Sequence, residues 1–253
     1  MTPPLEQRVI LGTRVDATSY ENATGRVINW AQAHESRAVV AANVHVVMEG
    51  HDDPSLQAAL STVDLVTPDG MPLVWMLRRL GFPRQARVYG PDLTLRVCEA
   101  ASKEKIPIGF YGSTVEALEA LRKSYRERFP QLQIAYAYAP PFRPLTMEED
   151  EAVVRAVNES GARILLVGLG CPKQERWVAE HRGRVHAVMM AVGAAFDFHS
   201  GRLRQAPRWM QRAGLEWLFR LLVEPRRLWR RYFRHNPRFL WLVMGQFLRY
   251  KEQ

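Results

Sequence analysis

Polar residues in this sequence follow short apolar runs, where a sheet would present them to a ligand. The apolar run 164–167 meets a Gly-Leu-Gly turn and then the polar segment Pro-Lys-Gln-Glu at 172–175. This order is typical of a buried strand, a tight turn and a helix N-terminus, whose free N–H groups suit a phosphate. A plain strand-to-helix connection is the alternative. We expect four residues to line this mouth: Gly168, Gly170, Gln174 and Glu175.

Two more polar residues follow apolar runs earlier in the chain. Asn43 comes after the run 37–42, and Asp69 comes after the run 64–68. The carboxyl ends of parallel strands meet at one edge of a sheet, so we expect both side chains in one crevice. A carboxylate beside a phosphate is what a general base for a sugar hydroxyl needs. Asn43 as a helix cap and Asp69 as a turn residue remain open alternatives.

The segment Arg87-Val-Tyr-Gly-Pro-Asp92 repeats this arrangement. It predicts a very short strand, a Gly-Pro turn and a helix. Arg87 is then expected to contact a phosphate or to pair with Asp69 or Asp92.

Strand and helix patterns alternate through residue 192. Such alternation predicts right-handed βαβ crossovers and a Rossmann-like, doubly wound, mostly parallel α/β sheet. The first strand is expected at 9–15, interrupted at Gly12. Capping-box patterns at 113–116 and 146–149 predict two helix starts.

The basic charge is concentrated in the last fifth of the chain. Residues 201–253 hold 13 Lys and Arg against 3 Asp and Glu, within a total net charge of +9. We therefore expect an α/β catalytic core at 1–200 and an arginine-rich helical appendage at 201–253, which meets an anionic partner. Arg220, Arg227 and Arg230 would share one face if their helices were collinear, and could clamp a diphosphate.

The apolar run 239–248 is too short to span a bilayer and has basic flanks, which fits an interfacial helix on an anionic membrane. A core-docking or dimerising helix is the alternative. No secretory signal is visible, and Cys98 and Cys171 are too few for a disulfide framework, so a cytoplasmic location is expected. The sequence offers no Asp-x-Asp metal motif at a strand end, since Asp52-Asp53 reads as a helix cap.

Several of these segments together resemble one family. The chain is similar along nearly its whole length to the WecG/TagA/CpsF glycosyltransferases. The motifs that carry this resemblance are Asn43, Asp69-Gly70, Arg87-Val-x-Gly-x-Asp92, Gly168-Leu-Gly-x-Pro-Lys-Gln-Glu175, Val192-Gly-Ala-Ala-Phe-Asp197, Arg204-x-Ala-Pro207, Leu215-Glu-Trp-Leu-x-Arg220 and Glu224-Pro225.

The resemblance implies an inverting, metal-independent hexosyltransferase. It would move a sugar, an N-acetylhexosamine or a related one, from a UDP-sugar to a polyprenyl-diphosphate-linked acceptor in cell-surface polysaccharide or teichoic-acid-type synthesis. The enzyme would lie on the inner face of the cytoplasmic membrane and need no cofactor besides the donor. Asp69 matches the proposed base, and Ala41 stands where members often have threonine. The resemblance leaves a homo-oligomer open.

The resemblance also implies a set of substrate-binding residues around the proposed base. They are Asn43, Arg87, Asp92, Gly168, Gly170, Gln174, Glu175, Asp197, Arg220, Arg227 and Arg230.

The sequence suggests two other classes of function. The basic tail, with Trp209, Trp217, Trp229 and Trp241, has the charge and aromatic rings of a module that binds nucleic acid or anionic lipid without catalysis. Its apolar run suits lipid better than bases, so no nucleic-acid partner is expected. A Rossmann-type oxidoreductase is excluded, because the Gly-Leu-Gly turn is not followed by x-x-Gly.

Overall fold

The computed structural model describes the backbone of residues 5–251 and the side chains of residues 5–248. Its centre is a six-stranded sheet in the order β4-β3-β8-β7-β5-β6, in which every neighbouring pair is parallel. The strands are β3 (Arg37–Ala42), β4 (Leu65–Pro68), β5 (Ile108–Gly112), β6 (Ile134–Tyr138), β7 (Ile164–Gly168) and β8 (Val188–Ala191). This sheet confirms the predicted fold class.

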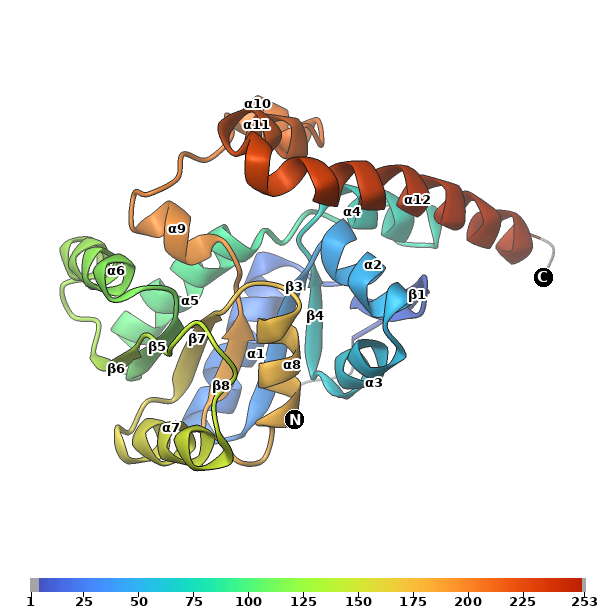
Figure 1. Cartoon of the computed structure of the whole chain (residues 1–253). Coiled ribbons are helices and arrows are strands. Elements are labelled where there is room, and N and C mark those ends of the chain that lie inside the picture. The colour runs from blue at the N-terminus through green and yellow to red at the C-terminus, as the bar shows by residue number, and fades with distance from the viewer. Residues whose placement is uncertain (1–4, 252–253) are drawn as a thin grey trace.

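Helices cover both faces of the sheet (Figure 1). They are α1 (Tyr20–Gln32), α2 (Val44–Asp52), α3 (Pro54–Thr62), α4 (Met71–Arg79), α5 (Gly90–Lys103), α6 (Val115–Arg128), α7 (Met147–Glu159), α8 (Lys173–Glu180) and α9 (Ala195–His199). Side chains alternate between two apolar cores, so Leu165 of β7 joins one core while Ile164 and Leu166 join the other. Burial on both faces explains why the strands read as continuous apolar runs.

The first strand differs from its prediction. The expected single strand at 9–15 is an antiparallel hairpin of β1 (Gln7–Ile10) and β2 (Thr13–Asp16). Its two-residue turn places Leu11 at φ 47° and Gly12 at φ 90°. Two positive φ values suit a tight hairpin, so Gly12 marks a reversal of the chain instead of an irregularity within one strand.

Two local predictions were wrong, and one was confirmed. The segment before α5 forms no strand, although Val88 N–H donates to the Pro68 carbonyl at 3.1 Å. Ser113 has φ 64° and cannot be an N-cap, so Thr114 caps α6 in its place. The capping box between Thr146 and Glu149 forms as predicted.

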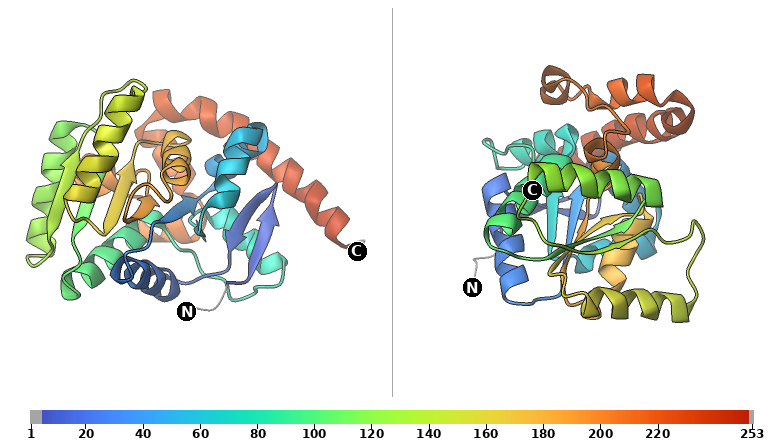
Figure 2. Two further views of the ribbon diagram at one scale, coloured as in Figure 1. Left: turned by 90° about the horizontal axis from the view of Figure 1, so that it is seen from below. Right: turned by 90° about the vertical axis from the view of Figure 1, so that its left-hand side faces the viewer.

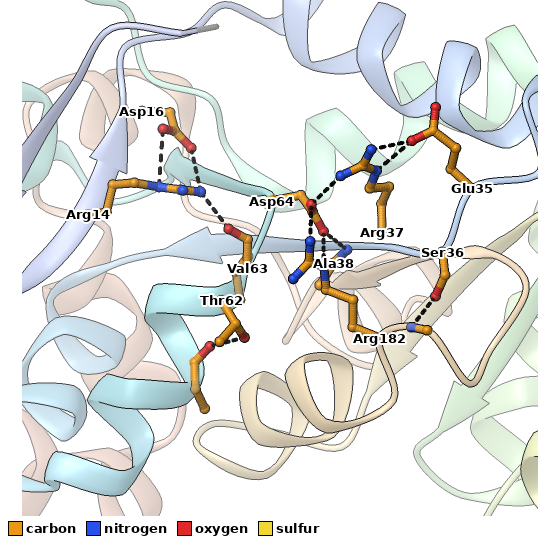
Figure 3. Close-up of polar contacts among 12 residues, drawn as sticks. Arg14, Asp16, Glu35, Ser36, Arg37, Ala38, Thr62, Val63, Asp64 and Arg182 are labelled. Atoms are coloured by element: carbon orange, nitrogen blue, oxygen red, sulfur yellow. Dashed lines mark hydrogen bonds and ion pairs between the residues drawn. The ribbon is translucent and has the colours of Figure 1, made fainter.

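A buried carboxylate connects the amino-terminal end of β3 with the segments that precede β4 and β8 (Figure 3). Asp64 accepts from Arg37 at 2.7 Å, from the backbone N–H of Ala38 at 2.9 Å, and pairs with Arg182 at 2.9 Å. Arg37 begins β3, Asp64 precedes β4, and Arg182 lies between α8 and β8. This cluster lies at the edge of the sheet opposite to the carboxyl ends of the strands.

The appendage lies along the carboxyl edge of the sheet (Figures 1 and 2). It contains α10 (Arg208–Arg212), α11 (Glu216–Val223) and α12 (Pro225–Lys251). Helix α12 packs on α2, and its residues Phe239 and Val243 enter an apolar core. Glu224, at φ −128° and ψ 56°, interrupts the helix, so the collinear arrangement considered above does not form. Among residues 5–251, no helix is both long and apolar enough to cross a bilayer.

Candidate active site

Asp69 lies in the loop after β4, at the carboxyl edge of the sheet. The backbone N–H groups of Asp69 and Gly70 both donate to the Ala42 carbonyl, at 2.8 and 3.2 Å, which holds this loop against β3. A Cβ on Gly70 would lie 3.2 Å from the Asn43 Cα. The missing side chain therefore allows the ends of β3 and β4 to come together.

Asn43 has both of the roles that the sequence left open. Its Oδ1 accepts from the N–H groups of His45 and Val46, at 3.0 and 3.4 Å, and so caps α2. Its Nδ2 donates to Asp69 Oδ2 at 3.4 Å. The Asn43 side chain therefore holds both the N-terminus of α2 and the Asp69 carboxylate. Asp69 Oδ1 accepts in addition from the Gly90 N–H at 3.0 Å.

Arg87 joins Asp69 to the appendage. Its Nε donates to the Asp69 carbonyl, and its Nη2 lies 3.6 Å from Asp69 Oδ1 and 2.7 Å from Glu216 Oε2. Glu216 begins α11 and also accepts from the Tyr89 hydroxyl at 2.9 Å. Glu216 belongs to one of the family motifs, but the sequence did not indicate its contact with Arg87. The side chains of Asp69, Arg87 and Glu216 are only 13–15% exposed, so α11 covers them.

The environment of Asp69 changes its acidity. Burial raises the pKa of Asp69 to about 6; the positive charge of Arg87 opposes this shift, and the negative charge of Glu216 adds to it. The Gly90 and Asn43 hydrogen bonds favour the ionised form. At neutral pH the group is therefore mostly a carboxylate, with a pKa closer to the working pH than an exposed aspartate has.

Gln174 and Glu175 begin α8 and are both buried. Gln174 Oε1 accepts from the Gly170 N–H at 3.1 Å, and its Nε2 donates to Glu175 Oε1 at 2.9 Å. Burial is the main cause of the raised pKa of Glu175. Gln174 therefore holds the turn after β7 in shape. The Cys171 thiol is another neighbour of Glu175.

The two glycines of that turn differ in their surroundings. A Cβ on Gly168 would lie 2.6 Å from the Phe196 ring, so this glycine makes room for an aromatic side chain. Gly170 has φ 81°, and a Cβ there would meet no atom within 4 Å. Of the two, only Gly170 faces open space where a ligand could approach. Its N–H is already held by Gln174.

Close contacts at two glycines connect the part of the sheet edge that carries Asp69 to the part that carries Gln174. A Cβ on Gly90 would lie 3.0 Å from the Ala41 side chain and 3.7 Å from the Val192 carbonyl. Gly193 follows Val192 in the chain, and a Cβ on Gly193 would lie 3.4 Å from Gln174 Nε2. The strand order places β8 between β3 and β7, so these contacts run along one continuous edge.

Two predicted residues lie outside this group of contacts. Asp92 accepts from the Tyr20 hydroxyl at 3.4 Å, and that hydroxyl accepts in turn from the Tyr89 N–H at 3.0 Å. Asp92 thus supports the segment that carries Tyr89. Asp197 lies in α9, where its carbonyl accepts from the Leu203 N–H at 3.0 Å.

The three predicted arginines do not lie on one continuous helix, because Arg220 belongs to α11 and the other two to α12. Arg220 and Arg227 lie 3.7 and 2.8 Å from Glu224, and Arg220 also stacks over Phe198 at 5.6 Å. Arg230 is exposed and lies over Trp229. The interruption at Glu224 causes this difference, because it resets the helical phase.

Arg231 turns inward and was missed from the sequence. Its Nε is buried with no hydrogen-bond partner among the described residues. Burial lowers the pKa of Arg231, and the like charges of Arg220 and Arg227 add to that effect. Its charge also influences Glu175 and His45, so the guanidinium lies near the starts of both α8 and α2. The signal was present in the buried, helically spaced series Leu228, Tyr232, His235, Phe239 and Val243.

Comparison with known proteins matches this chain to a family. Residues 8–253, which include the sheet and the appendage, match the family described as Glycosyl transferase WecG/TagA/CpsF family. The chain is 31% identical over 194 residues to the N-acetylglucosaminyldiphosphoundecaprenol N-acetyl-beta-D-mannosaminyltransferase of Bacillus spizizenii (strain W23). That alignment covers 76% of this chain and 73% of the relative.

Proposed function

This chain belongs to the WecG/TagA/CpsF family of glycosyltransferases, and from that premise we propose that it moves an N-acetylhexosamine from a UDP-sugar to a polyprenyl-diphosphate-linked acceptor. The name of the Bacillus relative supports this acceptor class and makes N-acetylmannosamine the first donor sugar to test. A β-linked product from an α-linked UDP-sugar requires inversion at the anomeric carbon. A single displacement achieves that, with one base and no covalent intermediate.

In the proposed reaction Asp69 is the base. An acceptor hydroxyl attacks the anomeric carbon, its proton passes to Asp69, and UDP leaves with the electron pair of the broken glycosidic bond. The observation that carries this assignment is the buried carboxylate with a pKa raised to about 6 at the carboxyl edge of the sheet. Asn43 and the Gly90 N–H hold Asp69 in place and leave part of its acceptor capacity for the hydroxyl.

The departing diphosphate needs positive charge, which we assign to arginines of the appendage. Arg231 lies near the starts of α2 and α8, with Arg220 and Arg227 as neighbours, and its buried Nε has no hydrogen-bond partner among the described residues. Guanidinium groups in a site shielded from water can stabilise a leaving diphosphate without a metal ion. We therefore propose that the transfer step is metal-independent and that only the UDP-sugar is needed as donor.

Access to Asp69 requires the appendage to move. The Glu216 carboxylate occupies the space beside Asp69 and Arg87, and all three side chains are mostly buried. We propose that α11 lifts when substrates enter and closes again over them. Closure would exclude water from the reacting carbon.

We place the enzyme on the inner face of the cytoplasmic membrane. The face of α12 turned away from the core exposes large apolar side chains at helical spacing: Phe233, Leu240, Trp241, Met244 and Leu248. Arg226, Arg230 and Arg234 are exposed on the same helix. An apolar stripe with a basic rim is typical of helices that lie on anionic bilayers. Co-sedimentation with vesicles containing phosphatidylglycerol tests this, and Trp241→Ser should weaken it; a stable dimer without vesicle binding would instead assign the stripe to a homo-oligomer.

The transfer activity is tested with short-chain polyprenyl-diphosphate acceptors and a panel of UDP-sugars, with products identified by mass spectrometry. We expect transfer from UDP-N-acetylmannosamine in the presence of EDTA, with no stimulation by added Mg²⁺ or Mn²⁺. Asp69→Asn should abolish transfer, while Glu119→Gln, at an exposed carboxylate on α6, should not. Transfer by Asp69→Asn at the wild-type rate would remove Asp69 from the role of base.

A further inference from the structure

Three potential metal ligands meet where the appendage crosses the core. His45 and Glu49 lie one turn apart on α2, and His235 projects from α12. Glu49 Oε1 lies 3.6 Å from His45 Nδ1 and 3.3 Å from His235 Nε2. One potential ligand atom from each of the three residues lies within 4.8 Å of those of the other two. The His45 and His235 side chains are only 13% and 5% exposed.

These separations fit a tetrahedral zinc ion. Zn–N and Zn–O bonds of about 2.0–2.2 Å at the tetrahedral angle place neighbouring ligand atoms about 3.3–3.6 Å apart. Two edges of the cluster already have such lengths. We propose that His45 Nδ1, Glu49 Oε1 and His235 Nε2 bind one Zn²⁺ ion between α2 and α12.

The state of the side chains supports metal binding over a simple hydrogen-bonded contact. A hydrogen bond between His235 Nε2 and Glu49 would still leave the Nδ1 atoms of both His45 and His235 buried, with no hydrogen-bond partner among the described residues. The nearby Arg231 charge opposes a cation, and the Glu49 carboxylate offsets it.

The proposed ion would connect the appendage to the active-site edge. Asn43 caps α2 and hydrogen-bonds to Asp69, and His45 is two residues further along. Zinc on His45, Glu49 and His235 would fix α12 to this same helix start. The bidentate pairing of Arg238 with Asp52, at 2.7 and 2.8 Å, supports the junction one turn further along α12. The ion has a structural role here, and no step of the sugar transfer passes through it.

Zinc binding to the full-length, tag-free protein tests the proposal. After dialysis against a chelator, ZnCl₂ is titrated by calorimetry, and bound metal is counted by mass spectrometry. We expect one zinc per chain, and binding more than tenfold weaker in His45→Ala, Glu49→Gln and His235→Asn. His51→Ala removes an exposed histidine from the same helix and should bind zinc as the wild type does. Cys171→Ser should also retain binding, since the thiol is not among the three ligands.

Hydrogen exchange locates the effect. Zinc should slow amide exchange in α2 and the first half of α12 in the wild type and in His51→Ala, but not in His235→Asn. His235→Asn keeps a polar side chain, and its circular dichroism shows whether it is folded. Unchanged zinc affinity in His45→Ala and His235→Asn would overturn the site. So would loss of binding in Cys171→Ser, or the absence of any protection of α12.

Discussion

The Asn43 amide donates to the Asp69 carboxylate at 3.4 Å while its oxygen caps α2. The start of a helix after β3 and the candidate base after β4 are thus parts of one hydrogen-bonded unit. Helix capping and the proposed positioning of the base therefore depend on the same side chain, and substitution can separate them.

Asn43→Ala should affect both properties. Loss of the cap lowers the free energy of unfolding by about 1 kcal/mol. Loss of the hydrogen bond to Asp69 raises the pKa of that carboxyl, because this bond favours its ionised form. Asn43→Ser is the matched control, since serine caps helices well but is too short to reach Asp69. We expect Asn43→Ser to show the shifted pH–rate profile with nearly wild-type stability in urea unfolding. Equal stability loss in both variants would contradict this separation.

The pKa of Asp69 makes its ionisation unfavourable for folding. With a folded pKa of about 6 and an unfolded value of 3.8, the native state binds more protons than the unfolded state between these pH values. Stability from this group is therefore present below about pH 4 and is lost as the pH rises to about 6, by about 3 kcal/mol. Asp69→Asn should lack this loss, so its melting temperature relative to the wild type should increase from pH 4 to pH 7. A constant difference across that range would contradict the raised pKa.

Glu216→Gln tests the contact between α11 and Arg87. The negative charge of Glu216 raises the pKa of Asp69, so its removal should lower that pKa. The ascending limb of kcat/KM against pH, expected near pH 6 in the wild type, should then move to lower pH. Weaker pairing with Arg87 should also loosen α11 and speed its proteolysis. Glu224→Gln, which removes a carboxylate from the same appendage away from Asp69, is the control that should leave the limb in place.

Arg231 and Arg230 offer a direct comparison of neighbouring residues. Arg231 turns inward toward α2 and α8, whereas Arg230 lies on the outside over Trp229. Arg231→Met should lower kcat/KM by about 10²-fold through lost stabilisation of the leaving diphosphate. Arg230→Met should change it by less than threefold in detergent-solubilised assays. A larger loss of kcat/KM in Arg230→Met than in Arg231→Met would contradict this assignment and favour Arg230 as the residue that contacts the diphosphate.

The sheet could be predicted because each inner strand is a continuous apolar run followed by glycine or a polar residue. The same rule placed Asn43 and Asp69 at one edge, since carboxyl ends of parallel strands lie together. Glu216 and Arg231 could not be assigned in this way. Their positions depend on how α11 and α12 pack on the core, and Glu224 resets the helical phase between them. The hairpin turn at Leu11 and Gly12 was missed because one glycine suggested only an irregularity.

The Asp64 cluster at the amino-terminal ends of the strands is a site where substitution should make the protein temperature-sensitive. Asp64 is 7% exposed and pairs with Arg37 and Arg182 from two other segments. Removing Asp64 leaves the buried backbone N–H of Ala38 without its partner, at a cost of about 1–3 kcal/mol, while the partly exposed Arg37 keeps its pairing with Glu35. Because the cluster lies at the opposite edge from Asp69, Asp64→Ala would yield a conditional allele, with normal turnover in the cold and collapse of the enzyme on warming.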